Sequence, residues 1–162
     1  MLIRETIPED LDELEALFAK GRAFMQKNGN SVQWHHNYPP RAFLEADMAK
    51  HQSYVVEEDG RIIGSFVLQL GDDPTYAVIE GGSWKNDAPY GTMHRVVSDG
   101  THHALFDEMV RWAFDRIPNL RGDTHALNQS MQRAFLRNGF EYCGIIYVAD
   151  GTPRYAYQKT GA

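Results

Sequence analysis

Apolar and polar positions follow two periods along the chain, and the change from one period to the other predicts the secondary structure. Spacings of three and four residues, typical of one helix face, predict helices over about 7–27, 40–50, 105–117 and 128–138. Short runs rich in β-branched and aromatic residues predict strands over 2–5, 53–57, 61–70, 77–80, 92–97, 120–124, 141–148 and 154–158. This order favours an α/β (α+β) fold, in which helices cover the faces of a mixed central sheet.

Capping and turn residues mark several of these boundaries. Thr6, with Glu9 three residues later, has the spacing of a capping box before the first helix. Glu58-Asp59-Gly60 predicts a hairpin between the strands on either side of it. Gly139 stands where a helix commonly ends in a left-handed cap. Local and periodic signals therefore agree.

Length and composition favour one globular domain spanning 1–162. The 162 residues include 43% hydrophobic and 23% charged residues, and no repeat or linker-like tract interrupts them. No apolar run approaches the ~18 residues of a membrane span, and the N-terminus lacks the features of a secretory signal. Cys143 is the only cysteine in the sequence. A single cysteine excludes a disulfide within this sequence. Because Cys143 lies in an apolar run, we expect it to be buried and structural rather than nucleophilic. These features favour a cytoplasmic protein with no membrane partner.

Charge and histidine placement bear on possible partners. The formal net charge is −6 and the basic residues are scattered, so no basic stripe predicts binding to nucleic acid. Mild acidity would steer a cationic ligand favourably, but it is also common in cytoplasmic proteins. His35-His36 and His102-His103 raise the question of a metal site. Adjacent side chains point apart on a strand or a helix and neither pair has zinc-site spacing, so we expect no metal.

The C-terminal third carries the most specific motif. The motif begins with the predicted strand at 120–124, which ends before His125, and Asn128 then opens a helix. The segment Leu136-Arg137-Asn138-Gly139-Phe140 ends this helix before a strand at 141–147. This strand-Asn-helix-Gly-Phe-strand order is similar to the second cofactor motif of the GNAT superfamily of N-acetyltransferases. The order of elements resembles that family over essentially the whole chain. The resemblance implies a GNAT fold of about seven strands flanked by about four helices, with acetyl-CoA as cosubstrate.

The same resemblance places the family's pyrophosphate-binding turn between His94 and Phe106. A turn that leads into a helix offers backbone N–H groups and the positive end of the helix dipole to an anion. The family pattern has Arg or Gln followed by Gly-x-Gly-x-Gly/Ala, whereas this loop is about one residue shorter and carries His102, His103 and Phe106 in place of small residues. Either the main-chain amides still hold the diphosphate, which we favour, or cofactor binding is weakened or lost. The expected cofactor contacts are Arg95, Val96, Val97, Gly100, Thr101, His102, His103, Ala104, Leu105, Asn128 and Phe135.

N-acyl transfer requires a deprotonated amine, a polarised thioester carbonyl and a proton for the departing thiolate. The resemblance implies direct attack in a ternary complex. A backbone N–H within 95–97 would stabilise the oxyanion, on a strand that splays from its neighbour. Glu80, at the end of a predicted strand, and His94 are the candidate catalytic bases. Each could instead be a satisfied polar residue at a strand end.

The sequence offers several possible sources for the thiolate proton. Phe135 stands where many family members carry a proton-donating Tyr. Tyr142, Tyr147 or water would therefore serve, or no dedicated acid exists. Phe135 could contact the pantetheine or belong to the core. Asn128 is expected to hydrogen-bond the pantetheine amides, or to act only as a helix cap.

Aromatic residues on loops often line clefts, and this pattern points to an acceptor site. Trp34, Tyr38 and Trp84 are the candidate substrate-binding residues, although the 33–38 loop could equally be a lid packed on the sheet. The expected partner is a small-molecule or peptide amine, and exposed strand edges leave a homodimer open. The predicted function is transfer of an acetyl group from acetyl-CoA to a primary amine. The alternative is a non-catalytic GNAT-fold protein that binds CoA or another small molecule.

Overall fold

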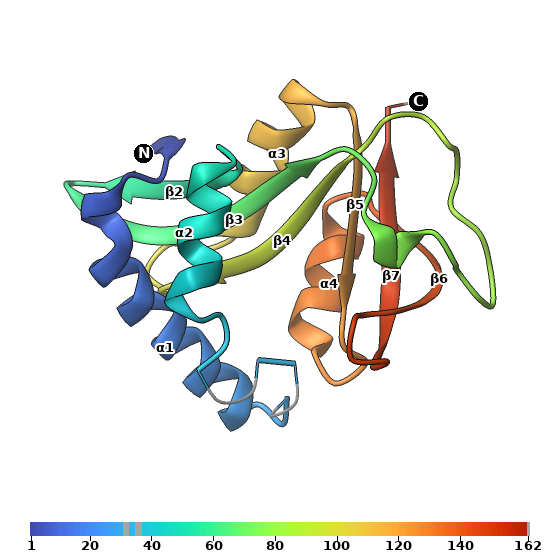
Figure 1. Cartoon of the computed structure of the whole chain (residues 1–162), viewed down its shortest axis with the longest axis horizontal. Helices are drawn as coiled ribbons and strands as arrows, with labels where there is room; N and C mark the ends of the chain where they lie inside the picture. The colour runs from blue at the N-terminus through green and yellow to red at the C-terminus, as the bar shows by residue number, and fades with distance from the viewer. Residues whose placement is uncertain (31–32, 35–36, 162) are drawn as a thin grey trace.

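A seven-stranded sheet forms the centre of the molecule in the computed structural model, which describes residues 1–30, 33–34 and 37–161 (Figure 1). The strands are β1 (Leu2–Glu5), β2 (Ser53–Glu58), β3 (Arg61–Leu70), β4 (Gly91–Ser98), β5 (Asn119–Thr124), β6 (Glu141–Tyr147) and β7 (Pro153–Thr160). The α-helices in the described residues are α1 (Leu11–Lys27), α2 (Arg41–Ala49), α3 (Leu105–Arg116) and α4 (Gln129–Arg137). Two 3₁₀ turns, η1 (Pro8–Asp10) and η2 (Pro74–Tyr76), complete the regular structure. The expected mixed sheet of about seven strands with about four helices is confirmed.

The strand order is β1-β2-β3-β4-β5-β7-β6, and its central junction is incomplete. β4 and β5 are parallel and pair at only two positions, Gly91 with Leu120 and Thr92 with Arg121. Beyond them the two strands separate, as Figure 1 shows, while β5 remains paired with β7 along its whole length. The sheet is therefore open from Met93 onwards, on the side where β4 leads towards α3.

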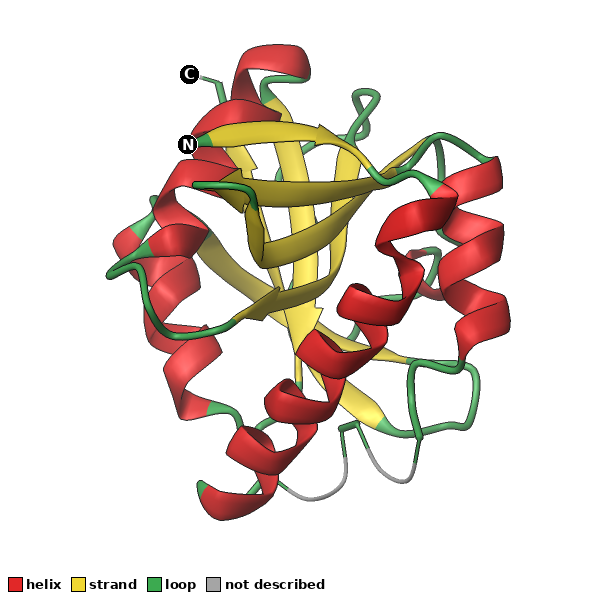
Figure 2. Ribbon diagram, turned by 90° about the vertical axis from the view of Figure 1, so that its left-hand side faces the viewer, coloured by secondary structure: helices red, strands yellow, loops and turns green. Residues whose placement is uncertain are grey.

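Two apolar clusters hold the helices on opposite faces of the sheet. Val55 and Val56, both fully buried, are neighbours on β2 and point to opposite faces, as strand geometry requires. Val55 packs in a cluster with Leu14 and Phe18 of α1, which crosses one face diagonally in Figure 2. Val56 packs in a cluster with Met109 of α3, on the other face. Fully burying one such side chain contributes about 1.5–3 kcal/mol, so both helix layers are firmly attached.

The structure contradicts two of the sequence-based predictions outside the functional site. The strand expected over 77–80 is wrong, because η2 precedes it and Glu80 makes only an isolated bridge with Ile145 of β6. β3 and β5 already occupy the two positions beside β4, so residues 77–80 meet only the edge strand of the sheet, β6.

The predicted capping box is also wrong in its residues. The backbone N–H of Ile7 donates to Asp10 rather than to Glu9, at 2.9 Å, and Asp10 pairs with Arg4. Thr6 instead shares a 2.7 Å hydroxyl hydrogen bond with Ser53.

None of the helices in the described residues is long and apolar enough to cross a membrane.

Candidate functional site

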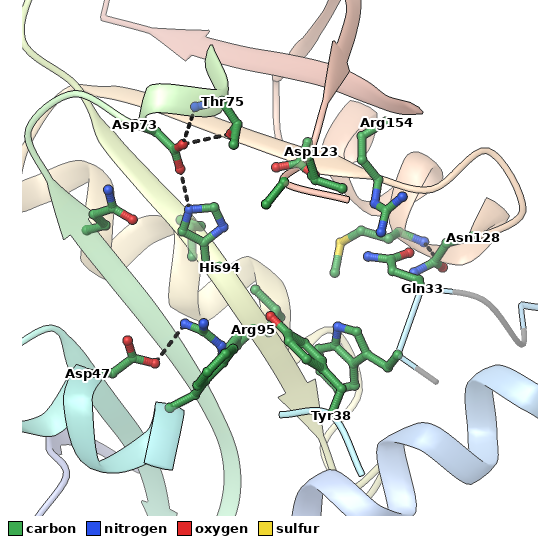
Figure 3. A pocket seen from close by; sticks show the side chains of 18 of the residues that line it. Gln33, Tyr38, Asp47, Asp73, Thr75, His94, Arg95, Asp123, Asn128 and Arg154 are labelled. Atoms are coloured by element: carbon green, nitrogen blue, oxygen red, sulfur yellow. Dashed lines mark hydrogen bonds and ion pairs between the residues drawn. The ribbon is translucent and has the colours of Figure 1, made fainter. Parts of the chain in front are cut away.

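A cavity of about 630 Å³ lies where β4 leaves β5. Four consecutive β4 residues, 93–96, contribute to its lining, together with residues from α1, α2, β5, α4 and β7. Figure 3 shows charged and aromatic side chains from these elements converging on it. The incomplete pairing of the two strands thus produces a hollow lined by groups that lie far apart in the sequence.

A carboxylate–imidazole pair lies on one wall of this cavity. His94 Nε2 is 2.9 Å from Asp73 Oδ2, and Asp73 also accepts hydrogen bonds from the backbone N–H of Thr75 at 2.9 Å and from its hydroxyl at 2.7 Å (Figure 3). Burial opposes ionisation of Asp73, but these hydrogen bonds prevail and lower its pKa to about 2. A carboxylate that accepts from Nε2–H leaves the lone pair on Nδ1. No described residue hydrogen-bonds His94 Nδ1, so this nitrogen is available as a base.

A second charged pair lies on the same strand. Arg95 donates to Asp47 of α2 at 2.7 Å, and its guanidinium lies over the rings of Tyr38, at 5.9 Å, and Phe43, at 5.4 Å. Burial raises the pKa of Asp47, although Arg95 and His94 oppose the shift. The pair and its two rings form the wall of the cavity nearest α2.

β4 also carries a bulge that alters its backbone beside the cavity. Ser65 of β3 faces Val97 and Val67 faces His94, so two residues of β4, Arg95 and Val96, oppose a single residue of β3. The extra residue of a bulge is left out of the ladder. β5 has already separated at this level and does not pair with it. A backbone N–H at 95–96 can therefore face a ligand, as the resemblance implied for the oxyanion.

The start of α3 has the features of an anion site. Gly100 N–H donates to Ser98 Oγ at 3.1 Å and Thr101 N–H donates to Asp99 at 2.9 Å, which folds the loop onto itself. The N–H groups of 102–106 have no acceptor among the described residues. Five consecutive free N–H groups at the positive end of a helix are a ready anion-binding arrangement. The loop achieves this with one glycine, Gly100.

The helix on the β5 side brings its first and middle turns to the cavity. Asn128 caps α4 by accepting from Met131 N–H at 3.1 Å, and both residues line the cavity. Phe135 stacks on Tyr157 with ring centroids 4.8 Å apart, is 2% exposed, and still contributes to the lining. Asn128 is therefore a helix cap beside the cavity, Phe135 is a core residue that reaches it, and contact of either residue with the pantetheine stays a prediction.

Two of the three acceptor candidates line the cavity, and the third packs in a separate apolar cluster. Trp34 and Tyr38 line the cavity, with Trp34 packed on Phe18 of α1 at 5.3 Å. Trp84 does not line it, because its indole N–H donates to the carbonyl of Tyr76 at 2.9 Å and its ring packs on that residue.

The two predicted bases also divide. Glu80 is exposed, lies outside the cavity and accepts from the Tyr147 hydroxyl at 3.0 Å, so the geometry favours His94 as the base. Tyr142 and Tyr147 are themselves exposed and outside the lining.

The remaining predicted residues follow β4 into the loop. Val97 is buried against α1, while residues 100–104 form the turn before α3 and Leu105 is the first residue of that helix. His102 Nδ1 is buried without a partner among the described residues. His35 and His36 lie outside the described residues. The described part of the chain contains no group of three His, Cys, Asp or Glu side chains that could hold a metal ion.

The cavity residues that the sequence analysis did not name include the charged residues Asp47, Asp73, Asp123 and Arg154. Asp73 lies 21 residues from its partner His94, and Asp47 lies 48 residues from Arg95. No local motif joins such residues, and only the tertiary fold brings them together. The one available signal was Asp-Pro at 73–74, which marks a turn start but not a catalytic partner.

A central sheet opened between two parallel strands, with an anion site at the helix that follows the first of them, defines the GNAT fold. The structure aligns with an acetyltransferase of the GNAT family from Streptococcus agalactiae 2603 at a TM-score of 0.91 and 29% identity, covering 99% of this chain and 95% of that one. A further acetyltransferase, from Staphylococcus aureus Mu50, aligns at a TM-score of 0.69 and 25% identity over 99% of both chains. These likenesses confirm the resemblance to GNAT-superfamily N-acetyltransferases.

More distant similarity shows the fold alone. A GNAT-like decarboxylase solved in complex with isobutyryl-CoA aligns at a TM-score of 0.66 and 16% identity, over 99% of this chain and 99% of that one. No protein-family model and no curated protein sequence matches the chain. The comparisons therefore establish the fold and the superfamily resemblance, and the reaction must be argued from the cavity.

Proposed function

We propose that this protein is an acyl-CoA-dependent N-acyltransferase that moves an acetyl group from acetyl-CoA to a primary amine by direct attack. One observation carries the proposal. Where it separates from β5, β4 carries an oriented base and a backbone bulge, and it then leads into a helix whose first N–H groups have no acceptor among the described residues. Acyl transfer by direct attack can use them as a base for the amine, a backbone donor to the oxyanion and a binding site for the diphosphate of CoA.

The chain fits the acyl-CoA at three places. The free N–H groups of 102–106 suit the diphosphate, because nothing in the described residues satisfies them. The cavity edge between β4 and α4 suits the pantetheine arm, because the Asn128 side-chain oxygen caps the helix while its NH₂ group has no acceptor among the described residues. Phe135 offers an apolar surface there. The bound thioester supplies an acyl group with a thiolate leaving group.

The cavity side supplies the amine with a base and orientation. His94 Nδ1 accepts one proton from the acceptor ammonium, and the Asp73 carboxylate stabilises the resulting imidazolium. The amine nitrogen then bonds to the carbonyl carbon, the C–S bond breaks, and its electron pair stays on sulfur. A second proton leaves the nitrogen as sulfur gains one. The overall change is ammonium plus thioester to amide, thiol and one released proton.

The thiolate receives its proton from solvent in this scheme. Phe135 carries no exchangeable proton, and the exposed Tyr142 and Tyr147 lie outside the cavity. A backbone N–H at 95–96 stabilises the developing oxyanion, a contribution that needs no particular side chain.

Calorimetry and a thiol-release assay test this function together. We expect acetyl-CoA to bind without added metal and to release CoA thiol in the presence of an accepted amine. His94→Asn should bind acetyl-CoA as tightly as the parent and lose about 10²–10⁴-fold in kcat. The exposed His51, replaced by Asn, is the matched control and should retain full activity.

The two functional readings give different results. Binding of acetyl-CoA with no thiol release across a broad amine panel would support the non-catalytic alternative. Absence of acetyl-CoA binding would refute both the transferase and the CoA-binding reading.

A further inference from the structure

Arg154 is a buried cation that the proposed chemistry does not use. It lies on β7, is 7% exposed and lines the cavity, and Figure 3 shows its side chain extending into that space. Its one hydrogen bond among the described residues goes to the Pro153 carbonyl, at 3.3 Å, and it makes no ion pair with them. Burial lowers the pKa of Arg154, although the charges of Asp123 and Asp150, which both line the cavity, oppose the shift without a direct contact. Burying a guanidinium without a carboxylate partner is costly, so the site calls for an anionic ligand.

The half-buried Arg95 and the buried Arg121 show how this fold holds an arginine in a structural role. Arg95 is paired with Asp47 at 2.7 Å. Arg121 donates to a backbone carbonyl at 2.8 Å, and its guanidinium lies 4.1 Å from the Trp84 ring and 3.9 Å from the Tyr90 ring. Each guanidinium is held by an ion pair or between two rings. Arg154 has neither, and it faces the cavity.

Asp123 places an opposite charge close to Arg154. β5 and β7 pair Asp123 with Ala156, and Arg154 lies two residues from Ala156, so both side chains are on the same face of the sheet. Such diagonal neighbours are about 7–8 Å apart. The field of Asp123 acts on Arg154 without a direct contact. Asp123 also accepts from the Tyr76 hydroxyl at 2.6 Å, and the Tyr76 ring lies 6.4 Å from that of His94.

We propose that the acceptor is a free amino acid, whose carboxylate binds Arg154 and whose ammonium lies between Asp123 and His94. A ligand whose anion lies one or two carbons from its cation can bridge two opposite protein charges that lie on one face of the sheet without touching each other. The inference rests on the proposed function and names its substrate class. Polyamines and aminoglycosides lack the carboxylate and leave Arg154 unpaired in the bound state.

Matched acceptors test the role of the carboxylate. Acetyl transfer is measured with the twenty free amino acids, their α-amides and the corresponding decarboxylated amines. For the best amino acid, we expect kcat/KM to exceed that of its amide and of its decarboxylated amine by about 30-fold or more, the loss typical of an unpaired buried charge. Equal rates for the three forms would overturn the inference.

Variants of Arg154 assign the effect to this residue. Arg154→Gln should raise KM for the amino acid by about 30-fold with kcat nearly unchanged, and should abolish the preference over the amide. Arg154→Lys should restore part of it, since the charge remains without the bidentate geometry. Arg61→Gln, at the exposed start of β3, is the control. Activity of Arg154→Gln towards the decarboxylated amine shows that the variant is folded.

The results separate failure of the inference from failure of the function. Acetyl transfer to carboxylate-free amines alone would keep the transferase and eliminate the amino-acid acceptor. An unchanged amino-acid preference in Arg154→Gln would eliminate Arg154 as its cause. If no amine is acetylated, thermal shifts with the same amino acids in the presence of CoA decide whether the cavity binds them, and an absence of shifts overturns the inference.

Discussion

Ala104 provides the sharpest test of where the diphosphate binds. It is the residue before α3, within the run of free N–H groups, and its φ of 59° is left-handed. Asp and Asn tolerate that conformation better than Ala does. Both also cap a helix at this position. Ala104→Asp and Ala104→Asn are therefore a matched pair that differs in one negative charge, and we expect neither to lower the thermal midpoint.

The size of the effect follows from Coulomb's law at the loop surface. One added charge at about 4 Å from each of two diphosphate charges costs about 1 kcal/mol per pair in a water-like dielectric. The sum, about 2 kcal/mol, predicts that Ala104→Asp binds acetyl-CoA about 30-fold more weakly than Ala104→Asn at low salt. Screening shortens the Debye length to about 3 Å at 1 M salt, so the ratio should fall to about 2–3-fold there.

Calorimetric titration of both variants at low and high salt measures this ratio. Two further ligands serve as controls. Dephospho-CoA keeps the diphosphate and should distinguish the two variants, whereas free pantetheine lacks the diphosphate and should bind both equally. Equal affinity of the two variants for acetyl-CoA at low salt would show that the diphosphate lies elsewhere. A ratio that does not change with salt would show that the substitution acts through the loop conformation and not through charge.

Two further predictions concern stability. Folding lowers the pKa of Asp73 from 3.8 to about 2. Its ionised form therefore stabilises the protein above about pH 4, and this stabilisation is lost as the pH falls towards 2. In denaturant unfolding, the free energy of unfolding of Asp73→Asn should fall with acid by about 2 kcal/mol less than that of the parent. A Cβ at Gly122 would lie 2.7 Å from Phe135 Cζ. Gly122→Ala should cost about 1–3 kcal/mol in urea unfolding, and adding Phe135→Leu should recover part of that loss.

The sequence predicted the parts of this fold that depend on local signals. The helix periodicity located α1 to within about four residues, and Gly139 has the expected left-handed φ of 83°. The hairpin at 58–60 joins β2 and β3 as expected. The strand at 77–80 failed because β-rich composition cannot reveal that the neighbouring sheet positions are taken. Propensity describes the segment, whereas pairing depends on the whole topology.

The site was predictable only where one residue's role follows from its position along β4. His94 could be named because it precedes the cofactor turn, but its partner Asp73 could not, because the contact joins β4 to a turn 21 residues earlier. The diagonal relation of Asp123 to Arg154 likewise depends on the pairing of β5 with β7. Charged residues at such positions look like ordinary surface residues until the sheet register is known.

The backbone at Arg95 explains how one strand supplies two neighbouring side chains to the cavity. Adjacent strand residues normally point to opposite faces, yet both His94 and Arg95 line it. Arg95 has a φ of 47° within the bulge, which interrupts the alternation. A non-glycine residue held in this region costs on the order of 1–3 kcal/mol. The Asp47 ion pair and the Tyr38 and Phe43 rings hold the side chain in place against that cost. The strained residue thus couples the wall nearest α2 to the backbone N–H that we propose as the oxyanion donor. A change in the residues around Arg95 should therefore alter both the proposed oxyanion site and acceptor binding.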